Sequence, residues 1–169
     1  MRITQSIARF AVITAIAATM ALTLSTGEAR AQDRETPYWA TMRFNEVNMR
    51  VGPSQEYPIE WVYKREGLPV KVVRLREGWR LVQDHDGTQG WIAASQLSPS
   101  LGALIIGDGP AELRSDASAS SAVRWRAEPG VVGDLIRCRE NHCEIDVAGR
   151  SGWVAKDRIW GAGDEEAAP

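Results

Sequence analysis

The chain has 169 residues and a formal net charge of −2 at pH 7. This length allows either one domain or two small domains near the lower size limit for a self-sufficient hydrophobic core. A mildly acidic chain lacks the clustered positive charge of nucleic-acid-binding proteins, so we expect no nucleic-acid partner.

Residues 1–31 have the features of a cleavable signal peptide. Arg2 and Arg9 supply positive charge around the start of an apolar stretch over residues 10–24, and residues 29–31 place small side chains where a signal peptidase cuts. A retained membrane anchor is the alternative, but the apolar stretch is shorter than the roughly 20 residues that span a bilayer. We therefore expect export to a periplasm or to the cell exterior, with no stable membrane span after cleavage.

The rest of the chain repeats one pattern. Residues 48–54 have the sequence Asn-Met-Arg-Val-Gly-Pro-Ser, and residues 112–118 have the sequence Glu-Leu-Arg-Ser-Asp-Ala-Ser. Each copy has a tryptophan eleven positions after its arginine and closes with Gly-Trp-Ile (90–92) or Gly-Trp-Val (152–154). The repetition indicates two copies of one small unit.

The repeat sets the expected domain boundaries. The first copy covers residues 42–98 and the second covers residues 103–160, with a short linker of turn residues at 98–102. Residues 32–41 are polar and are expected to be frayed. Residues 161–169 form an acidic tail that has little to bury, and this tail is expected to be disordered.

Each copy is predicted to be all-β. Short segments rich in Val, Ile and Trp alternate with turn residues, which predicts strands at Val47–Arg50, Ile59–Lys64, Pro69–Leu75, Trp79–Gln83 and Gln89–Ile92. A single helical turn is expected near Ala93–Leu97 and again near Lys156–Ile159. Such short strands favour a small, strongly bent barrel, because closure removes exposed strand edges.

Residues 48–54 resemble the opening signature of bacterial SH3-like domains. The turn at Gly67, the position of Trp79 and the closing Gly-Trp-Ile resemble the rest of that family's pattern. The resemblance covers nearly all of 42–98 and is looser over 103–160, where the signature lacks its Gly-Pro. It implies two tandem SH3-like β-barrels similar to cell-wall or peptide-binding accessory modules. Such modules are frequently attached to wall hydrolases, but the sequence shows no hydrolase domain.

The opening motif is expected to be structural. Arg50 can lay its aliphatic stem on the barrel while its guanidinium group bonds carbonyls of the long loop that follows. Asn48 can bond nearby backbone at the start of that loop. Gly52 and Pro53 would turn the chain, with Gly52 at positive φ.

Aromatic residues are expected to fill two roles. Those expected to pack inside the barrels are Trp61, Trp91, Trp125 and Trp153. Tyr57 in the long loop, Tyr63 near the end of a predicted strand and Trp79 at the start of another could line a shallow groove for an extended peptide or a sugar ring. The alternative is that these three only cover the end of the barrel. In the second copy Ser121 aligns with Tyr57 and Cys143 aligns with Trp79, so we expect any groove in the first copy.

Cys138 and Cys143 are predicted to form a disulfide, because an exported chain enters an oxidising compartment. They align with Leu75 and Trp79, at the facing ends of two predicted strands joined by a four-residue loop, which can bring the two Cα atoms within disulfide range. A metal site that adds His142 has poor spacing and no obvious fourth ligand. A redox pair is also disfavoured, because the spacing is not Cys-x-x-Cys.

No catalytic centre is expected. The two histidines, His85 and His142, fall in separate predicted turns, and the sequence contains no phosphate-binding loop or metalloprotease motif. The acidic turn 84–86 has too few spaced oxygen ligands for Ca²⁺. We therefore predict that the protein is not an enzyme and has no metal and no cofactor.

Three hypotheses for function remain. The leading one is a non-catalytic, exported binding module whose ligand is a peptidoglycan stem peptide or a Pro-containing segment of an envelope protein. The alternative is a structural protein–protein assembly factor of the envelope without a small ligand. The third is a subunit that assists or forms a hydrolase.

Overall fold

The computed structural model describes residues 35–162. The predicted signal peptide at 1–31 lies outside the described residues, and so does all but the start of the predicted tail at 161–169. Among the residues described, no helix is long and apolar enough to cross a membrane.

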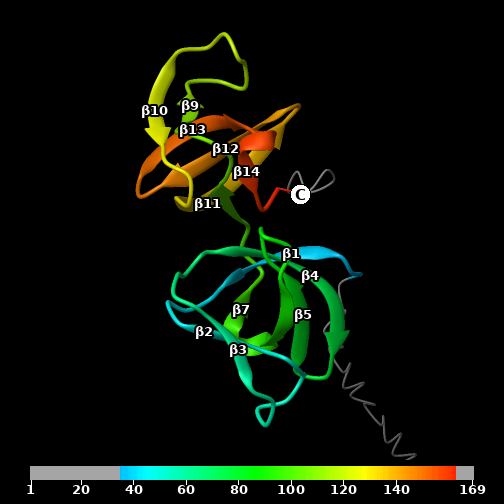
Figure 1. The fold of residues 1–169 in the computed structure, drawn as a ribbon. Helices are drawn as coiled ribbons and strands as arrows, with labels where there is room; N and C mark the ends of the chain where they lie inside the picture. Colours follow the sequence, from blue (N-terminus) through cyan, green and yellow to red (C-terminus); the bar gives the residue numbers. More distant parts are fainter. Residues whose placement is uncertain (1–34, 163–169) are drawn as a thin grey trace, which may run out of the picture. The chain divides into compact units, whose positions relative to one another are not determined.

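Seven antiparallel strands form the first sheet (Figure 1). They are β1 (Tyr38–Met42), β2 (Val47–Arg50), β3 (Ile59–Tyr63), β4 (Pro69–Arg76), β5 (Trp79–Gln83), β6 (Gln89–Ala93) and β7 (Leu97–Ser98). Their order in the sheet is β3-β2-β6-β5-β4-β1-β7. A 3₁₀ turn, η1 (Ala94–Gln96), joins β6 to β7. The strands curl around a common interior and form a small barrel.

The second sheet repeats the first. Its strands are β8 (Gly102–Ile105), β9 (Ala111–Arg114), β10 (Val123–Ala127), β11 (Val132–Arg139), β12 (His142–Val147), β13 (Arg150–Ala155) and β14 (Ile159–Trp160), with η2 (Lys156–Arg158) before the last strand. The order β10-β9-β13-β12-β11-β8-β14 puts each strand in the place of the strand numbered seven lower. Only residues 99–101 separate β7 from β8. The predicted all-β class and the two tandem barrels are confirmed.

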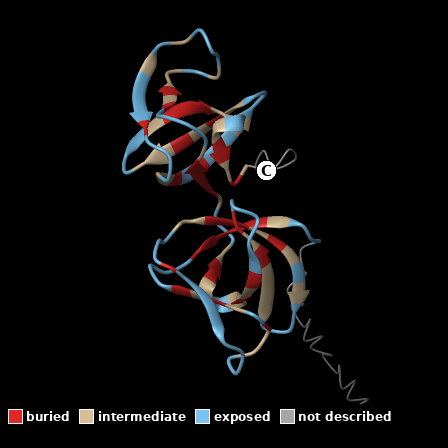
Figure 2. Ribbon diagram, viewed as in Figure 1, coloured by how far each residue is buried: buried red, intermediate tan, exposed pale blue. Residues whose placement is uncertain are grey.

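Each barrel has its own hydrophobic core (Figure 2). The first core contains Ala40, Met42, Val47, Met49, Tyr63, Val70, Val72, Val82, Ile92 and Leu97. The second contains Ala103, Ile105, Ala111, Leu113, Ala127, Leu135, Cys143, Ile145, Val154 and Ile159. Strands β2 and β9 both alternate buried and half-buried side chains, as expected for strands with one face on a core. The hydrophobic residues of the two copies therefore play equivalent parts.

The closing Gly-Trp pattern has a packing reason. A Cβ atom on Gly152 would lie 2.8 Å from Leu113 Cβ, and a Cβ atom on Gly90 would collide with the side chain of Met49. Met49 and Leu113 occupy equivalent positions in β2 and β9. In each barrel a glycine leaves the space that a large core side chain of the neighbouring strand fills.

The predicted strands agree closely with the structure. Strands β2 and β5 begin and end at the predicted residues, and β3, β4 and β6 differ from the prediction only at their last residue. Both single helical turns are present as η1 and η2.

The prediction that residues 32–41 are frayed is wrong for residues 38–41. Tyr38–Met42 form β1, which pairs with β4 and with β7. Trp39, Ala40 and Met42 are buried, so this segment contributes apolar surface that a small barrel needs. Gly102, assigned to the linker from the sequence, begins β8, the equivalent strand of the second barrel.

Candidate functional site

The long loop that follows the first repeat strand is held in the same way in both barrels. Arg50 Nη1 donates to the carbonyl oxygen of Tyr57 at 2.6 Å, and Arg114 Nη1 donates to the carbonyl oxygen of Ser121 at 2.6 Å. A backbone hydrogen bond closes each loop, from Val51 to Pro58 and from Ser115 to Ala122 in the second barrel. The expected role of Arg50 as a loop anchor is confirmed.

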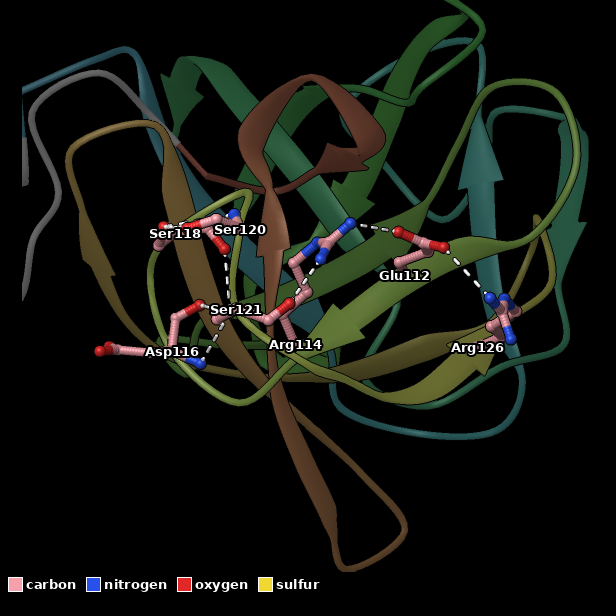
Figure 3. A network of polar contacts seen from close by, with 7 residues as sticks. All are labelled: Glu112, Arg114, Asp116, Ser118, Ser120, Ser121 and Arg126. Atoms are coloured by element: carbon pink, nitrogen blue, oxygen red, sulfur yellow. Dashed lines mark hydrogen bonds and ion pairs between the residues drawn. The ribbon is translucent and has the colours of Figure 1, made fainter.

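Gly52 is needed for a different reason from the one predicted. Its φ is not positive, but a Cβ atom there would lie 2.6 Å from ring carbons of Tyr57. The Tyr57 ring therefore packs directly on the glycine backbone. In the second barrel the equivalent residues are Asp116 and Ser121, and Ser121 Oγ lies 3.0 Å from the carbonyl oxygen of Asp116 (Figure 3). A polar contact thus replaces the aromatic one.

Tyr63 is buried, which removes it from the predicted groove. It is only 7% exposed, and its hydroxyl donates to Asp84 Oδ2 at 2.8 Å. The other carboxylate oxygen of Asp84 accepts the backbone N–H groups of Asp86 and Thr88. Burial, and then the hydrogen bond to Asp84, raise the pKa of Tyr63 well above its usual range. Asp84 and Tyr63 thus tie the β5–β6 turn to β3.

Exposed apolar side chains gather in residues 51–62 of the first barrel. They are Val51, Tyr57, Ile59, Trp61 and Val62, and we call them the β3 surface. Trp61 is 58% exposed, so the prediction that it packs inside the barrel is wrong. The physical reason is that β3 is an outer strand, paired within the described residues only with β2, and its register shifts next to Trp61.

The equivalent tryptophan of the second barrel is also exposed, but an arginine side chain covers one face of its ring. Trp125 is 44% exposed, against the prediction that it packs, and the Arg150 guanidinium carbon lies 5.3 Å from its ring centroid. Such a cation over the ring face is attracted by the aromatic quadrupole. The prediction of core positions holds for Trp153, which is 4% exposed, whereas Trp91 is only partly buried.

The strand register changes the alignment of Trp79. Trp79 pairs with Arg76 across the β4–β5 turn, and His142 pairs with Arg139 across the β11–β12 turn. His142 is therefore the counterpart of Trp79, and the alignment of Cys143 with Trp79 is wrong. The side chain of Trp79 is half-buried at the start of β5.

The predicted disulfide between Cys138 and Cys143 is present. The two cysteines are direct cross-strand partners on β11 and β12, and the pairing of Arg139 with His142 leaves a turn of two residues instead of the predicted loop of four. The bridge takes the place of the pair formed by Leu75 and Arg80 in the first barrel. Within residues 35–162, no group of three or more His, Cys, Asp and Glu side chains is placed to hold a metal ion.

A network of charged side chains on the second barrel was not anticipated from the sequence. Arg114 Nη2 donates to Glu112 Oε2, and Arg126 Nη2 donates to Glu112 Oε1 at 3.2 Å (Figure 3). The three residues come from the paired strands β9 and β10. The alternation of Glu112 and Arg114 on β9 is the signal that would have placed them on one face.

Two small, strongly bent antiparallel barrels, each with an arginine-anchored long loop, define the structural class of this protein. The bacterial SH3 domain family matches residues 44–99 and again residues 107–161. The chain belongs to the bacterial SH3 domain family, of which it carries two copies in tandem.

Comparison with solved structures gives matches at low identity and low TM-score. NlpC2 from Trichomonas vaginalis is 12% identical with a TM-score of 0.35, over 80% of this chain and 52% of that chain. An NlpC/P60 family protein from Bacillus cereus is 12% identical with a TM-score of 0.33, over 78% of this chain and 59% of that chain. The chain thus spans little more than half the length of these proteins. Comparison with curated proteins gives no match.

Proposed function

We propose that the protein is a non-catalytic, exported binding module whose first barrel binds an extended segment in the cell envelope. The segment is a peptidoglycan stem peptide or a stretch of an envelope protein. The observation that carries the proposal is the exposure of Trp61 on the outer strand β3. A large aromatic ring held in water on a rigid strand is a typical anchor for a binding partner.

The position of β3 suits an extended ligand. Within the described part of the chain β3 pairs with β2 on one side only, so its other edge has main-chain groups available to a further strand. Ile59 and Trp61 are exposed on the same strand and offer apolar contacts to alternate side chains of such a ligand. Affinity would then come from the main chain and selectivity from the β3 surface.

Trp79 supports a groove beside this strand. Its counterpart His142 shares a pocket with Arg126 on the second barrel, and the counterpart of Arg126 is Val62 of the β3 surface. From this equivalence we expect Trp79 to lie near Val62. We keep Tyr57 and Trp79 as proposed ligand contacts, with Trp61 and Val62 in place of Tyr63.

Family membership and the disulfide support export and a binding role. Disulfides persist in oxidising compartments outside the cytoplasm, and Cys138 and Cys143 are joined.

Retention on purified wall sacculi tests the proposal. The variant that combines Tyr57→Ala with Trp61→Ala is expected to lose retention, because it removes two exposed rings. Trp125→Ala, at the equivalent exposed position of the second barrel, is the matched control and is expected to bind like the wild type. Circular dichroism checks that all variants are folded.

Three outcomes decide among the hypotheses. Wild-type retention by the double variant rules out the β3 surface. No retention of the wild-type protein, together with capture of an envelope protein through Trp61, favours the assembly factor instead. Turnover of wall fragments by the isolated chain would overturn the non-catalytic role.

A further inference from the structure

A pocket on the second barrel combines an apolar floor with basic walls. It has a volume of about 410 Å³, within the range of small-molecule sites. Val154 and Ala155 contribute apolar surface, and Arg126, His142 and Arg158 contribute polar groups. All these residues come from β10, β12, β13 and η2 of one barrel.

Backbone carbonyl groups fix Arg158 in this pocket. Its Nε donates to the carbonyl oxygen of Ile106 at 3.1 Å, and its Nη2 donates to those of Asp108 and Gly109 at 3.1 and 2.7 Å. Among the described residues, no carboxylate lies within ion-pair distance of Arg158. Three backbone carbonyls therefore orient the guanidinium group, and within residues 35–162 its positive charge meets no carboxylate and its Nη1 donates to no group.

Arg114 and Arg126 share a single carboxylate. Both donate to Glu112, one to each carboxylate oxygen (Figure 3). With Arg158, three guanidinium groups line a pocket that holds one carboxylate, so the pocket carries excess positive charge. Arg126 is 64% exposed and keeps donors that Glu112 does not use.

Arg126 and Arg158 belong to the second barrel alone, whereas Arg114 has the counterpart Arg50 in the first barrel. By strand register Arg126 corresponds to Val62, and His142 corresponds to Trp79. Arg158 ends η2 where Gln96 ends η1. The same backbone positions thus carry uncharged side chains in the first copy and Arg126 and Arg158 in the second, so the fold itself does not require these two arginines.

We propose that the pocket of the second barrel binds a ligand through a carboxylate group, with Arg126 and Arg158 as its partners. A guanidinium group matches a carboxylate with two parallel hydrogen bonds, and such charge-assisted bonds are stronger than neutral ones. The apolar floor suits the short aliphatic body of a small peptide. The carboxylate is supplied either by the C-terminus of a peptide or by an acidic side chain. This site is separate from the β3 surface and does not rest on the wall-binding proposal.

Calorimetric titration of the full chain with three acetylated alanine tripeptides tests the ligand chemistry. The first peptide has a free C-terminus, the second is amidated, and the third is amidated but has glutamate at its centre. We expect the free acid, the glutamate peptide or both to bind at least tenfold more tightly than the amidated alanine peptide. Whichever of the two binds more tightly identifies the source of the carboxylate. Equal affinity for all three peptides, or no binding of any, overturns the proposal.

Substitutions test the residues. Arg126→Gln is expected to weaken binding of the carboxylate peptide about tenfold, the effect of losing one charge-assisted contact, and Arg126→Lys is expected to restore part of it. Arg124→Gln is the matched control, because Arg124 is an exposed arginine of the same strand that does not line the pocket. An Arg126→Gln variant that binds like the wild type overturns the assignment. Because no wall material is used, a negative result leaves the sacculus assay unaffected.

Discussion

Tyr63 and Asp84 form a buried polar pair in the first barrel. The hydroxyl and the carboxylate meet at 2.8 Å, and both residues are almost completely shielded from water. A buried carboxylate is costly unless its oxygens are hydrogen-bonded, and here both are. The second barrel has Ala127 at the position of Tyr63, so this pair is particular to the first copy.

Removal of the hydroxyl with Tyr63→Phe is expected to lower the free energy of unfolding of the first barrel by about 1–3 kcal/mol, because Asp84 loses a buried partner. Urea denaturation measures the loss. Tyr57→Phe is the matched control, since the Tyr57 side chain is exposed and its hydroxyl has no partner in the described structure.

The pH dependence of this pair has a defined sign. The raised pKa of Tyr63 means that the folded barrel holds the proton more tightly than the unfolded chain, in which tyrosine ionises near pH 10. The contribution of Tyr63 is therefore fully present below that pH and is lost as the pH rises above it. A wild-type barrel no more sensitive to alkali than the Tyr63→Phe variant would contradict the assignment.

Single residues show how far the candidate site could be predicted. The loop-anchoring role of Arg50 followed from its long side chain and its place before a loop. The burial of Tyr63 did not, because its partner Asp84 lies on a different hairpin and local sequence does not specify that contact. The exposure of Trp61 was missed for a similar reason, since apolar periodicity does not say which strand lies at the edge of the sheet.

Among the hairpins, β11–β12 is the one with a covalent cross-link. The Cys138–Cys143 bridge joins directly opposed residues close to the turn. The corresponding β4–β5 hairpin of the first barrel has Leu75 opposite Arg80 and relies on non-covalent contacts. The disulfide therefore strengthens the copy that resembles the family pattern less.

Replacement of both Cys138 and Cys143 with alanine is expected to destabilise the second barrel by roughly 2 kcal/mol, the chain-entropy estimate for so short a loop. Guanidinium denaturation with and without dithiothreitol measures the effect. The reductant should weaken the wild-type protein and leave the double variant unchanged. Equal stability of the oxidised and reduced wild-type protein would show that the bridge contributes nothing.

Elements with strong local signals were predictable, and one without them was not. Strands β2 and β5 combine alternating apolar residues with clear turns at their ends. β1 was missed because polar residues precede it. It also pairs with β4, which is distant in the sequence and is not joined to it by a hairpin turn. The apolar strand β8 occupies the equivalent position in the second copy, and a comparison of the two segments would have revealed β1.

At the scale of the whole molecule, duplication has preserved the frame and changed the surface. The two sheets have the same strand order and the same loop hydrogen bonds, and each encloses its own core. Side chains at equivalent outer positions differ in chemistry, as with Val62 and Arg126. The two copies are thus built to fold alike and to contact different groups.

Separate cores predict separate responses to core damage. Ile92→Ala and Ile145→Ala each remove a fully buried side chain and should each cost about 2–5 kcal/mol. Hydrogen exchange should show loss of amide protection in residues 38–98 for the first variant and in residues 102–160 for the second. Loss of protection throughout the chain in either variant would indicate one cooperative unit instead.

The three-residue connection between β7 and β8 gives the molecule a property that neither barrel has alone. Such a short linker keeps one barrel close to any partner that the other barrel has already bound, so the second binding event becomes intramolecular. Two individually weak binding contacts would then combine into long-lived attachment to a surface that offers the ligands of both barrels. Avidity of this sort needs no increase in the strength of either contact.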